Sequence, residues 1–184
     1  FNPYNVWLRF YRHDYLTERG LLFTNQRVGQ DAVFCIDVLE KGFDGIYYLP
    51  ASLYDHELRD GSAVYRYQPT RYQCELTIAR RLKGLFEKLT LTGDRRFTEF
   101  LDDRFVMAVS IEAGNLVTPQ CPMSAREAAA WLKKAASDPD IQRSVRELPL
   151  GYYAKKSKKL MLLMLKARMY GPLLALKRLG KRKI

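Results

Sequence analysis

The chain has 184 residues, 47% of them hydrophobic and 12% aromatic, so wholesale disorder is excluded and one ordinary domain, or slightly more, is expected. Its excess positive charge of +11 falls in residues 151–184, which hold eleven Lys and Arg and no Asp or Glu, whereas residues 1–150 are neutral overall. This distribution argues against nucleic acid and predicts one local anionic partner. The three cysteines are scattered, which argues against a disulfide framework.

The first third of the chain is expected to mix strands with short helices. The expected elements are a β-prone segment at 5–12, a helix at 14–18, a helix at 30–41 that Gly42 ends, and strand segments at 45–50 and 52–56. The periodicity of the helix at 30–41 is the clearest local signal of this part. Residues 1–65 are therefore predicted to form a small α/β unit.

The remainder of the chain is expected to be helical. Candidate helices lie at 69–91, 94–112, 125–137, 139–148 and 154–170, followed by a break at Gly171-Pro172 and a last short helix to about Leu179. Ser124 and Glu127 have the spacing of a capping box. The predicted fold class is α+β, mainly helical, with a helical subdomain at 66–150 and a basic tail at 151–184.

An ordered series of aromatic, basic and turn residues runs through the first third of the chain. Its members are Trp7, Tyr11-Arg12, Tyr15-Leu16, Phe23, Gly29-Gln30-Asp31, Phe34, Tyr47-Tyr48, Tyr54, His56, Arg59 and Ser62. The series resembles the last catalytic segment of bacterial family-2 glycosyltransferases, which are inverting enzymes with the GT-A fold. The resemblance implies that residues 1–65 are the end of a GT-A-like catalytic domain. It also implies that the amino-terminal nucleotide-binding half, with its Asp-x-Asp motif, is missing.

The resemblance implies an activity for the full-length protein. That activity is transfer of a sugar, of the hexosyltransferase type, from a nucleotide-sugar donor to a glycan or lipid-linked acceptor, with a divalent metal, Mg or Mn, as cofactor. This chain would supply the acceptor side and would be inactive alone. The alternative is a non-catalytic membrane-binding or scaffolding module derived from such an enzyme.

The residue that the resemblance assigns as catalytic base is Asp31. Inverting transfer needs a base to take the proton of the acceptor hydroxyl, and a carboxylate at the mouth of a helix can do this. The other interpretation is that Asp31 only caps the helix, since Asp is favoured there and complements the helix dipole. The two interpretations are compatible.

Five further residues follow from the same resemblance. Trp7, Gln30, Arg59 and Ser62 are the expected acceptor or substrate contacts, and His56 is the expected metal ligand. Four of them have an ordinary alternative. A lone Trp can be a core residue, Arg59 and Ser62 can belong to a simple turn, and His56 can be a hydrogen-bonded surface residue. Gln30 stands where the family often has Glu, so one acidic charge is lost there.

The basic tail predicts attachment to an anionic membrane surface. Its apolar run at 160–165 is too short to span a bilayer, which needs roughly 20 apolar residues, so a position in the interface is favoured. The expected membrane-binding residues are Lys155, Lys156, Lys158, Lys159, Lys166 and Arg168. The expected location is cytoplasmic, peripheral at the inner face of the cell membrane. The alternative is a helix that packs on the body and leaves a solvated basic rim; nucleic acid is not expected.

Overall fold

The computed structural model describes residues 6–43, 45–51, 53–55 and 66–181. In chain order its elements are η1 (Val6–Leu8), α1 (His13–Glu18), α2 (Gln30–Lys41), α3 (Arg71–Lys88), η3 (Leu91–Gly93), α4 (Arg95–Leu116), α5 (Ala125–Ala135), α6 (Pro139–Glu147), η4 (Leu150–Tyr152), α7 (Lys156–Lys166) and α8 (Tyr170–Lys181). Every regular element in the described part of the chain is thus an α-helix or a 3-10 turn.

Three consecutive helices, α4, α5 and α6, begin at a side-chain cap. The Asp94 side chain caps α4 by accepting a hydrogen bond from the Arg96 backbone N–H. Ser124 and Glu127 form the predicted capping box at the start of α5. Asp138 caps α6. Each cap satisfies a backbone N–H that the first helical turn leaves without an intrahelical acceptor.

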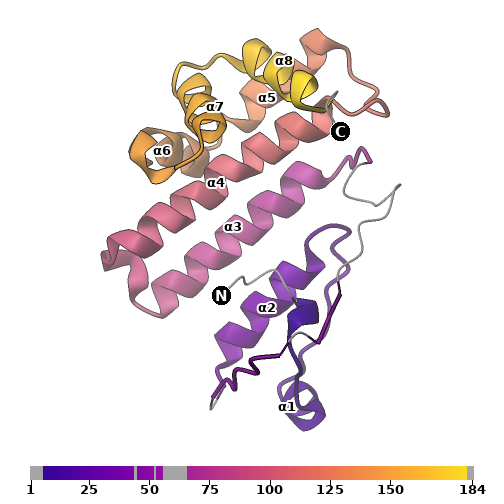
Figure 1. Ribbon diagram of the computed structural model, residues 1–184, viewed down its shortest axis with the longest axis vertical. Helices are drawn as coiled ribbons and strands as arrows, with labels where there is room; N and C mark the ends of the chain where they lie inside the picture. Colours follow the sequence, from indigo (N-terminus) through magenta and orange to yellow (C-terminus); the bar gives the residue numbers. More distant parts are fainter. Residues whose placement is uncertain (1–5, 44, 52, 56–65, 182–184) are drawn as a thin grey trace.

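The helices are arranged in layers around α4. Figure 1 shows α2, α3 and α4 side by side, with α7 and α8 over the far side of α4. The contacting pairs α2–α3, α3–α4 and α4–α8 confirm that order, and α8 also packs against α5. Phe105, Val106 and Val109 of α4 are fully buried, and they belong to one core that extends from Ile36 in α2 to Leu173 in α8. The tail helix α8 is therefore packed into the same core as the body.

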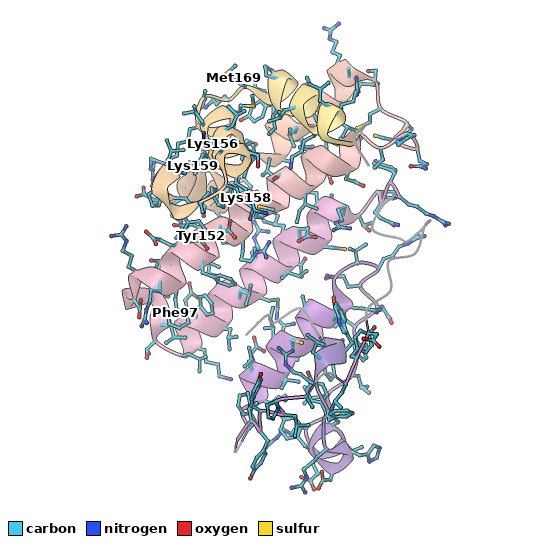
Figure 2. All side chains as sticks on the ribbon, in the orientation of Figure 1. Phe97, Tyr152, Lys156, Lys158, Lys159 and Met169 are labelled. Carbon is cyan, nitrogen blue, oxygen red and sulfur yellow. The ribbon has the colours of Figure 1, made fainter. Side chains whose placement is uncertain are left out.

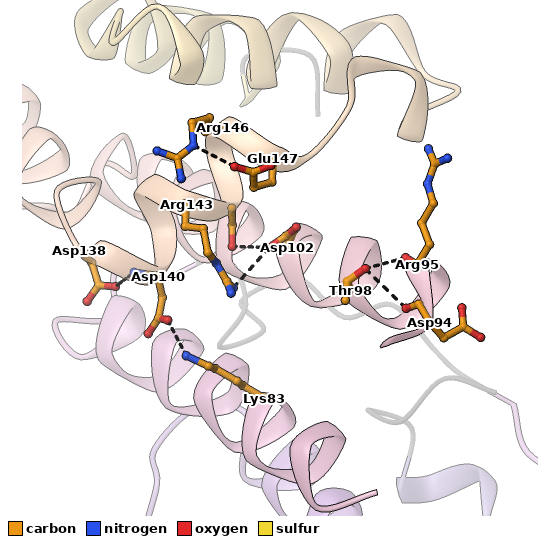
Figure 3. Close-up of polar contacts among 11 residues, drawn as sticks. Lys83, Asp94, Arg95, Thr98, Asp102, Asp138, Asp140, Arg143, Arg146 and Glu147 are labelled. Carbon is orange, nitrogen blue, oxygen red and sulfur yellow. Dashed lines mark hydrogen bonds and ion pairs between the residues drawn. The ribbon is translucent and has the colours of Figure 1, made fainter. Parts of the chain in front are cut away.

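A polar seam joins α6 to α3 and α4. Asp140 in α6 accepts from Lys83 Nζ at 2.9 Å, and Asp102 in α4 accepts from Ser144 Oγ at 2.7 Å (Figure 3). The Arg143 guanidinium lies 3.5 Å from the same Asp102 carboxylate. These contacts fix α6 across two neighbouring helices.

The prediction of an α/β unit at 1–65 is wrong, because none of the described residues lies in a strand. Val6–Leu8 forms a 3-10 turn, and the described residues of the expected strands at 45–50 and 52–56 are irregular and exposed. A strand needs a neighbour to accept its backbone hydrogen bonds, and the described part offers these segments none. Since a GT-A domain is built on a sheet, the chain is not a GT-A fragment, and the resemblance was misleading.

The predicted break at Gly171-Pro172 is also wrong. Both residues lie in the first turn of α8, and α7 ends earlier, at Lys166. Proline is tolerated in a first helical turn, because the backbone N–H that it lacks would have no intrahelical acceptor there. The domain boundaries at 65 and 150 stay predictions.

Candidate membrane-binding surface

Asp31, the expected base, lies half-buried in the first turn of α2. Its Oδ1 accepts a hydrogen bond from the Ala32 backbone N–H at 2.9 Å, and the exposed Gln30 precedes it. The N-cap position belongs to Gly29, whose φ is 73°. A Cβ at Gly29 would lie 2.5 Å from Ile78 Cδ1, so a side chain there would be strained in its backbone and would force Ile78 to shift. The position of Asp31 suits a residue that complements the helix dipole, and its catalytic role stays a prediction.

Trp7 lies on a turn beside the same helix. The side chain is 41% exposed, and η1 packs against α2. The neighbouring Arg9 donates from Nη1 to Cys35 Sγ in α2 at 3.2 Å. The structure therefore brings the turn that carries Trp7 to the helix that begins with Gln30 and Asp31. Its contact with an acceptor stays a prediction.

The other predicted catalytic-site residues are outside the described part of the chain. These are the expected metal ligand His56 and the expected substrate contacts Arg59 and Ser62. Within the described residues, no group of three or more His, Cys, Asp or Glu has the arrangement of a metal site. The divalent metal and glycosyl transfer itself stay predictions, now without support from the fold.

The outer face of α7 carries apolar and basic residues together. Lys156, Leu160, Leu163 and Ala167 follow one another at helical spacing, and all four are exposed. Leu160 is 41% exposed and Leu163 is 50% exposed. Lys159 lies along the same side of the helix, and Lys155, the exposed N-cap residue, precedes Lys156. Figure 2 places Lys156 and Lys159 at the α7 end of the molecule. We call this set the outer stripe of α7.

The opposite face of α7 is used inside the protein. Met161, Leu162 and Leu165 are buried in the common core, and Leu162 is fully enclosed. This packing corresponds to the alternative of a Leu/Met helix lying on the body with a basic rim. The exposed leucines of α7 both lie on the outer stripe, where a partner can reach them. None of the described helices combines the length and apolarity needed to cross a bilayer.

The ion pairs of the described residues all involve cations of the body, although other body cations, such as Arg27 and Lys41, form none. In the body, many Arg and Lys side chains have carboxylates within 4.0 Å. These pairs are Arg71–Glu75, Arg80–Asp138, Arg80–Asp140, Arg81–Asp37, Arg81–Glu40, Lys83–Asp140, Arg95–Glu99, Arg96–Asp94, Arg143–Asp102 and Arg146–Glu147. Among the described residues, no carboxylate forms an ion pair with any of the six cations predicted to bind membrane. The last acidic residue of the chain is Glu147.

Two tail lysines help to fix α7 in place. Lys166 Nζ donates to the Arg146 backbone carbonyl at 2.7 Å, and Lys158 Nζ lies 5.2 Å from the centre of the Tyr153 ring. Tyr153 in turn donates its hydroxyl to Asp103 Oδ1 of α4 at 2.5 Å. Burial and this hydrogen bond raise the pKa of Tyr153, so the hydroxyl remains a donor. Tyr153 therefore links Lys158 of α7 to α4, while α7 itself packs against α6 and α8.

The turn after α7 has the hydrogen bonds of a Schellman motif. The Met169 backbone N–H donates to the Met164 carbonyl at 2.8 Å, and the Arg168 N–H donates to the Leu165 carbonyl at 3.0 Å. Arg168 occupies the left-handed position of this motif, with φ 56°. Both Arg168 and Met169 are exposed, so the turn extends the outer stripe by one cation and one apolar side chain.

A buried carboxylate was not identified from the sequence. Glu112 in α4 is 3% exposed and accepts from Trp131 Nε1 at 2.8 Å and from Asn115 Nδ2 at 3.1 Å. Asn115 also pairs with the backbone of Gln68 just before α3. Burial raises the pKa of Glu112, and its two hydrogen-bond donors and Arg71 oppose that shift. The cluster joins three segments of the chain and has a structural role.

Comparison of the chain with protein-family models, with curated proteins and with solved structures found no match.

Proposed function

We propose that the chain is a helical module that binds an anionic membrane surface through the outer stripe of α7. The observation that carries the proposal is the combination of exposed Leu160 and Leu163 with lysines that have no carboxylate partner among the described residues. Such a surface suits the boundary between lipid headgroups and acyl chains.

The electrostatic part of the proposal rests on the absence of acidic residues after Glu147. A row of like charges repels itself, and an anionic surface removes that repulsion by supplying counter-charge. Each basic residue near an anionic leaflet gains about 1 kcal/mol. Three such residues correspond to roughly a hundredfold in affinity.

The apolar part rests on Leu160 and Leu163. The long aliphatic stems of the flanking lysines allow their ammonium groups to stay at headgroup level while the leucines enter the acyl boundary. The buried face of α7 stays with the protein core. Binding is therefore shallow and reversible, and we place the protein at the inner face of the cell membrane, where anionic lipids would hold it.

The test is sedimentation with vesicles of phosphatidylcholine, with and without phosphatidylglycerol, at low and high salt. The variant is Lys155→Gln, Lys156→Gln and Lys159→Gln combined. Its binding to the anionic vesicles is expected to fall about a hundredfold. Binding of the unmodified chain is expected to weaken at high salt, because exposed charges are screened.

A matched control removes the same amount of charge from the side of the molecule that carries α2. It combines Arg27→Gln, Lys41→Gln and Lys88→Gln, three exposed residues. This control is expected to bind vesicles like the unmodified chain. Equal loss of binding in both triple variants would mean that net charge, rather than the outer stripe, is responsible. Tighter binding to a short DNA duplex than to the vesicles would reject the membrane as partner.

A further inference from the structure

Arg168 stands at a backbone position that disfavours its own side chain. Its φ of 56° is left-handed, and the Schellman turn in which it lies usually has glycine there. A side chain with a Cβ is strained in this conformation, whereas glycine adopts it freely. An observed backbone outlier of this kind is a reason to look for a function.

The surroundings of Arg168 identify the chemistry of a partner. The guanidinium lies on an exposed turn, and no described carboxylate pairs with it. The next residue, Met169, is 46% exposed and projects from the α7 end of the molecule (Figure 2). A guanidinium can bind a phosphate through two parallel hydrogen bonds, and methionine is a flexible apolar side chain that fills irregular space.

We propose that Arg168 occupies this turn because its guanidinium binds the phosphate group of a membrane phospholipid, while Met169 enters the adjoining acyl-chain boundary. The inference rests on the proposed function, since it assigns a specific contact to the end of the outer stripe. The lysines of the stripe supply general attraction, and Arg168 supplies a contact with defined geometry.

The decisive variant is Arg168→Gly. It relieves the backbone strain, so the melting temperature is expected to rise by about 2–4 °C. Its affinity for vesicles that contain phosphatidylglycerol is expected to fall about fivefold, the effect of one basic residue near an anionic leaflet. A stability gain together with a binding loss is the expected signature of a residue retained for function.

Thr90→Gly is the matched control. Thr90 also has a left-handed φ, 55°, and lies between α3 and η3, away from the outer stripe. The substitution is expected to raise the melting temperature without any change in vesicle binding. A binding loss in Thr90→Gly equal to that in Arg168→Gly would overturn the inference, because the effect would then follow from altered backbone rather than from the guanidinium.

Arg168→Lys tests the phosphate contact. It keeps the charge but cannot form the two parallel hydrogen bonds, so it is expected to restore only part of the affinity lost in Arg168→Gly. Full restoration would overturn the bidentate contact. If the lysine triple variant loses binding while Arg168→Gly does not, this inference fails and the proposed function stands. If the unmodified chain does not bind anionic vesicles, the proposed function fails as well.

Discussion

The indole Nε1 of Trp131 in α5 donates a 2.8 Å hydrogen bond to Oε1 of Glu112, a carboxylate in α4 that is 3% exposed. Burial raises the pKa of Glu112. No described cation forms an ion pair with this carboxylate; its two hydrogen-bond donors, Trp131 and Asn115, are neutral, and Arg71 acts on it at longer range. Glu112 is therefore a titratable group in the protein interior, and the fluorescent indole of Trp131 lies in direct contact with it.

The first prediction concerns the pH dependence of stability. A raised pKa means that the folded state binds the Glu112 proton more tightly than the unfolded chain does. Its contribution to stability is therefore fully present below the unfolded pKa and is lost as pH rises through the folded pKa. We expect Glu112→Gln to remove this decline, which amounts to at most about 1.4 kcal/mol per pH unit for one proton. The free energy of unfolding is measured at each pH, from mildly acidic to neutral, by urea denaturation followed by tryptophan fluorescence.

Glu127→Gln is the control, because the pKa of Glu127 is shifted in the opposite direction to that of Glu112. The Glu127 pKa is lowered by its hydrogen bonds to Ser124, so its contribution is present above the unfolded pKa and is lost as pH falls. Glutamine retains the capping box, so only the pH dependence should change. The same pH profile in both variants would refute the assignment of the decline to Glu112.

The second prediction concerns Gly29. Gly29→Ala places a Cβ 2.5 Å from Ile78 Cδ1 at a residue with φ 73°. We expect the free energy of unfolding to fall by more than about 1 kcal/mol in chemical denaturation. Gly84→Ala, at an exposed position about one turn before the end of α3, has open space around its Cβ and should instead stabilise by about 0.5–1 kcal/mol. Stabilisation in both would show that the left-handed N-cap is not required.

The third prediction separates packing from membrane contact in neighbouring leucines. Leu162 is fully buried, so Leu162→Ala should lower the free energy of unfolding by about 2–5 kcal/mol. Leu163 is 50% exposed, so Leu163→Ser should change stability by less than about 0.5 kcal/mol but weaken vesicle binding. Thermal unfolding and vesicle sedimentation on the same samples distinguish the two roles. Unchanged vesicle binding in Leu163→Ser would exclude insertion by the outer stripe.

The fourth prediction concerns the anchor of α7. Tyr153→Phe removes the 2.5 Å hydrogen bond to Asp103 and leaves that carboxylate without its Tyr153 donor. We expect a loss of about 1–3 kcal/mol in the free energy of unfolding. The ring remains for Lys158, so the loss reports the hydroxyl alone. Hydrogen exchange of α7 amides should accelerate, and unaltered exchange would mean that other contacts hold the helix.

Local signals in the sequence were sufficient for several helices. The helix at 30–41 and the Ser124–Glu127 capping box were predicted correctly, because apolar spacing and cap chemistry act over a few residues. The residues Gly171-Pro172 were misread, because the same pair can interrupt a helix or stand in its first turn. The left-handed residue of the turn after α7 is Arg168 and not a glycine, so no glycine marked the end of α7 in the sequence.

Features that depend on distant contacts were beyond the sequence. A strand at 45–50 required a pairing partner that no local pattern can supply, and the segment is irregular in the structure. The Glu112–Trp131 bond joins two helices, and nothing in the sequence marks this glutamate as buried. The division of α7 into buried Leu162 and exposed Leu163 also depends on where α6 and α8 lie. The basic character of the tail and its lack of acidic residues were evident, because both can be counted directly in the sequence.

The layered packing of α2, α3, α4 and α8 separates α2 from the tail helices. Each helix-to-helix step measures about 8–10 Å, so three steps hold α2 roughly 25–30 Å from the tail helices. The potential of a charged leaflet decays over about 8 Å at physiological ionic strength. A molecule resting on its outer stripe would therefore carry the turn of Trp7 and the start of α2 well clear of that potential, out in bulk solution.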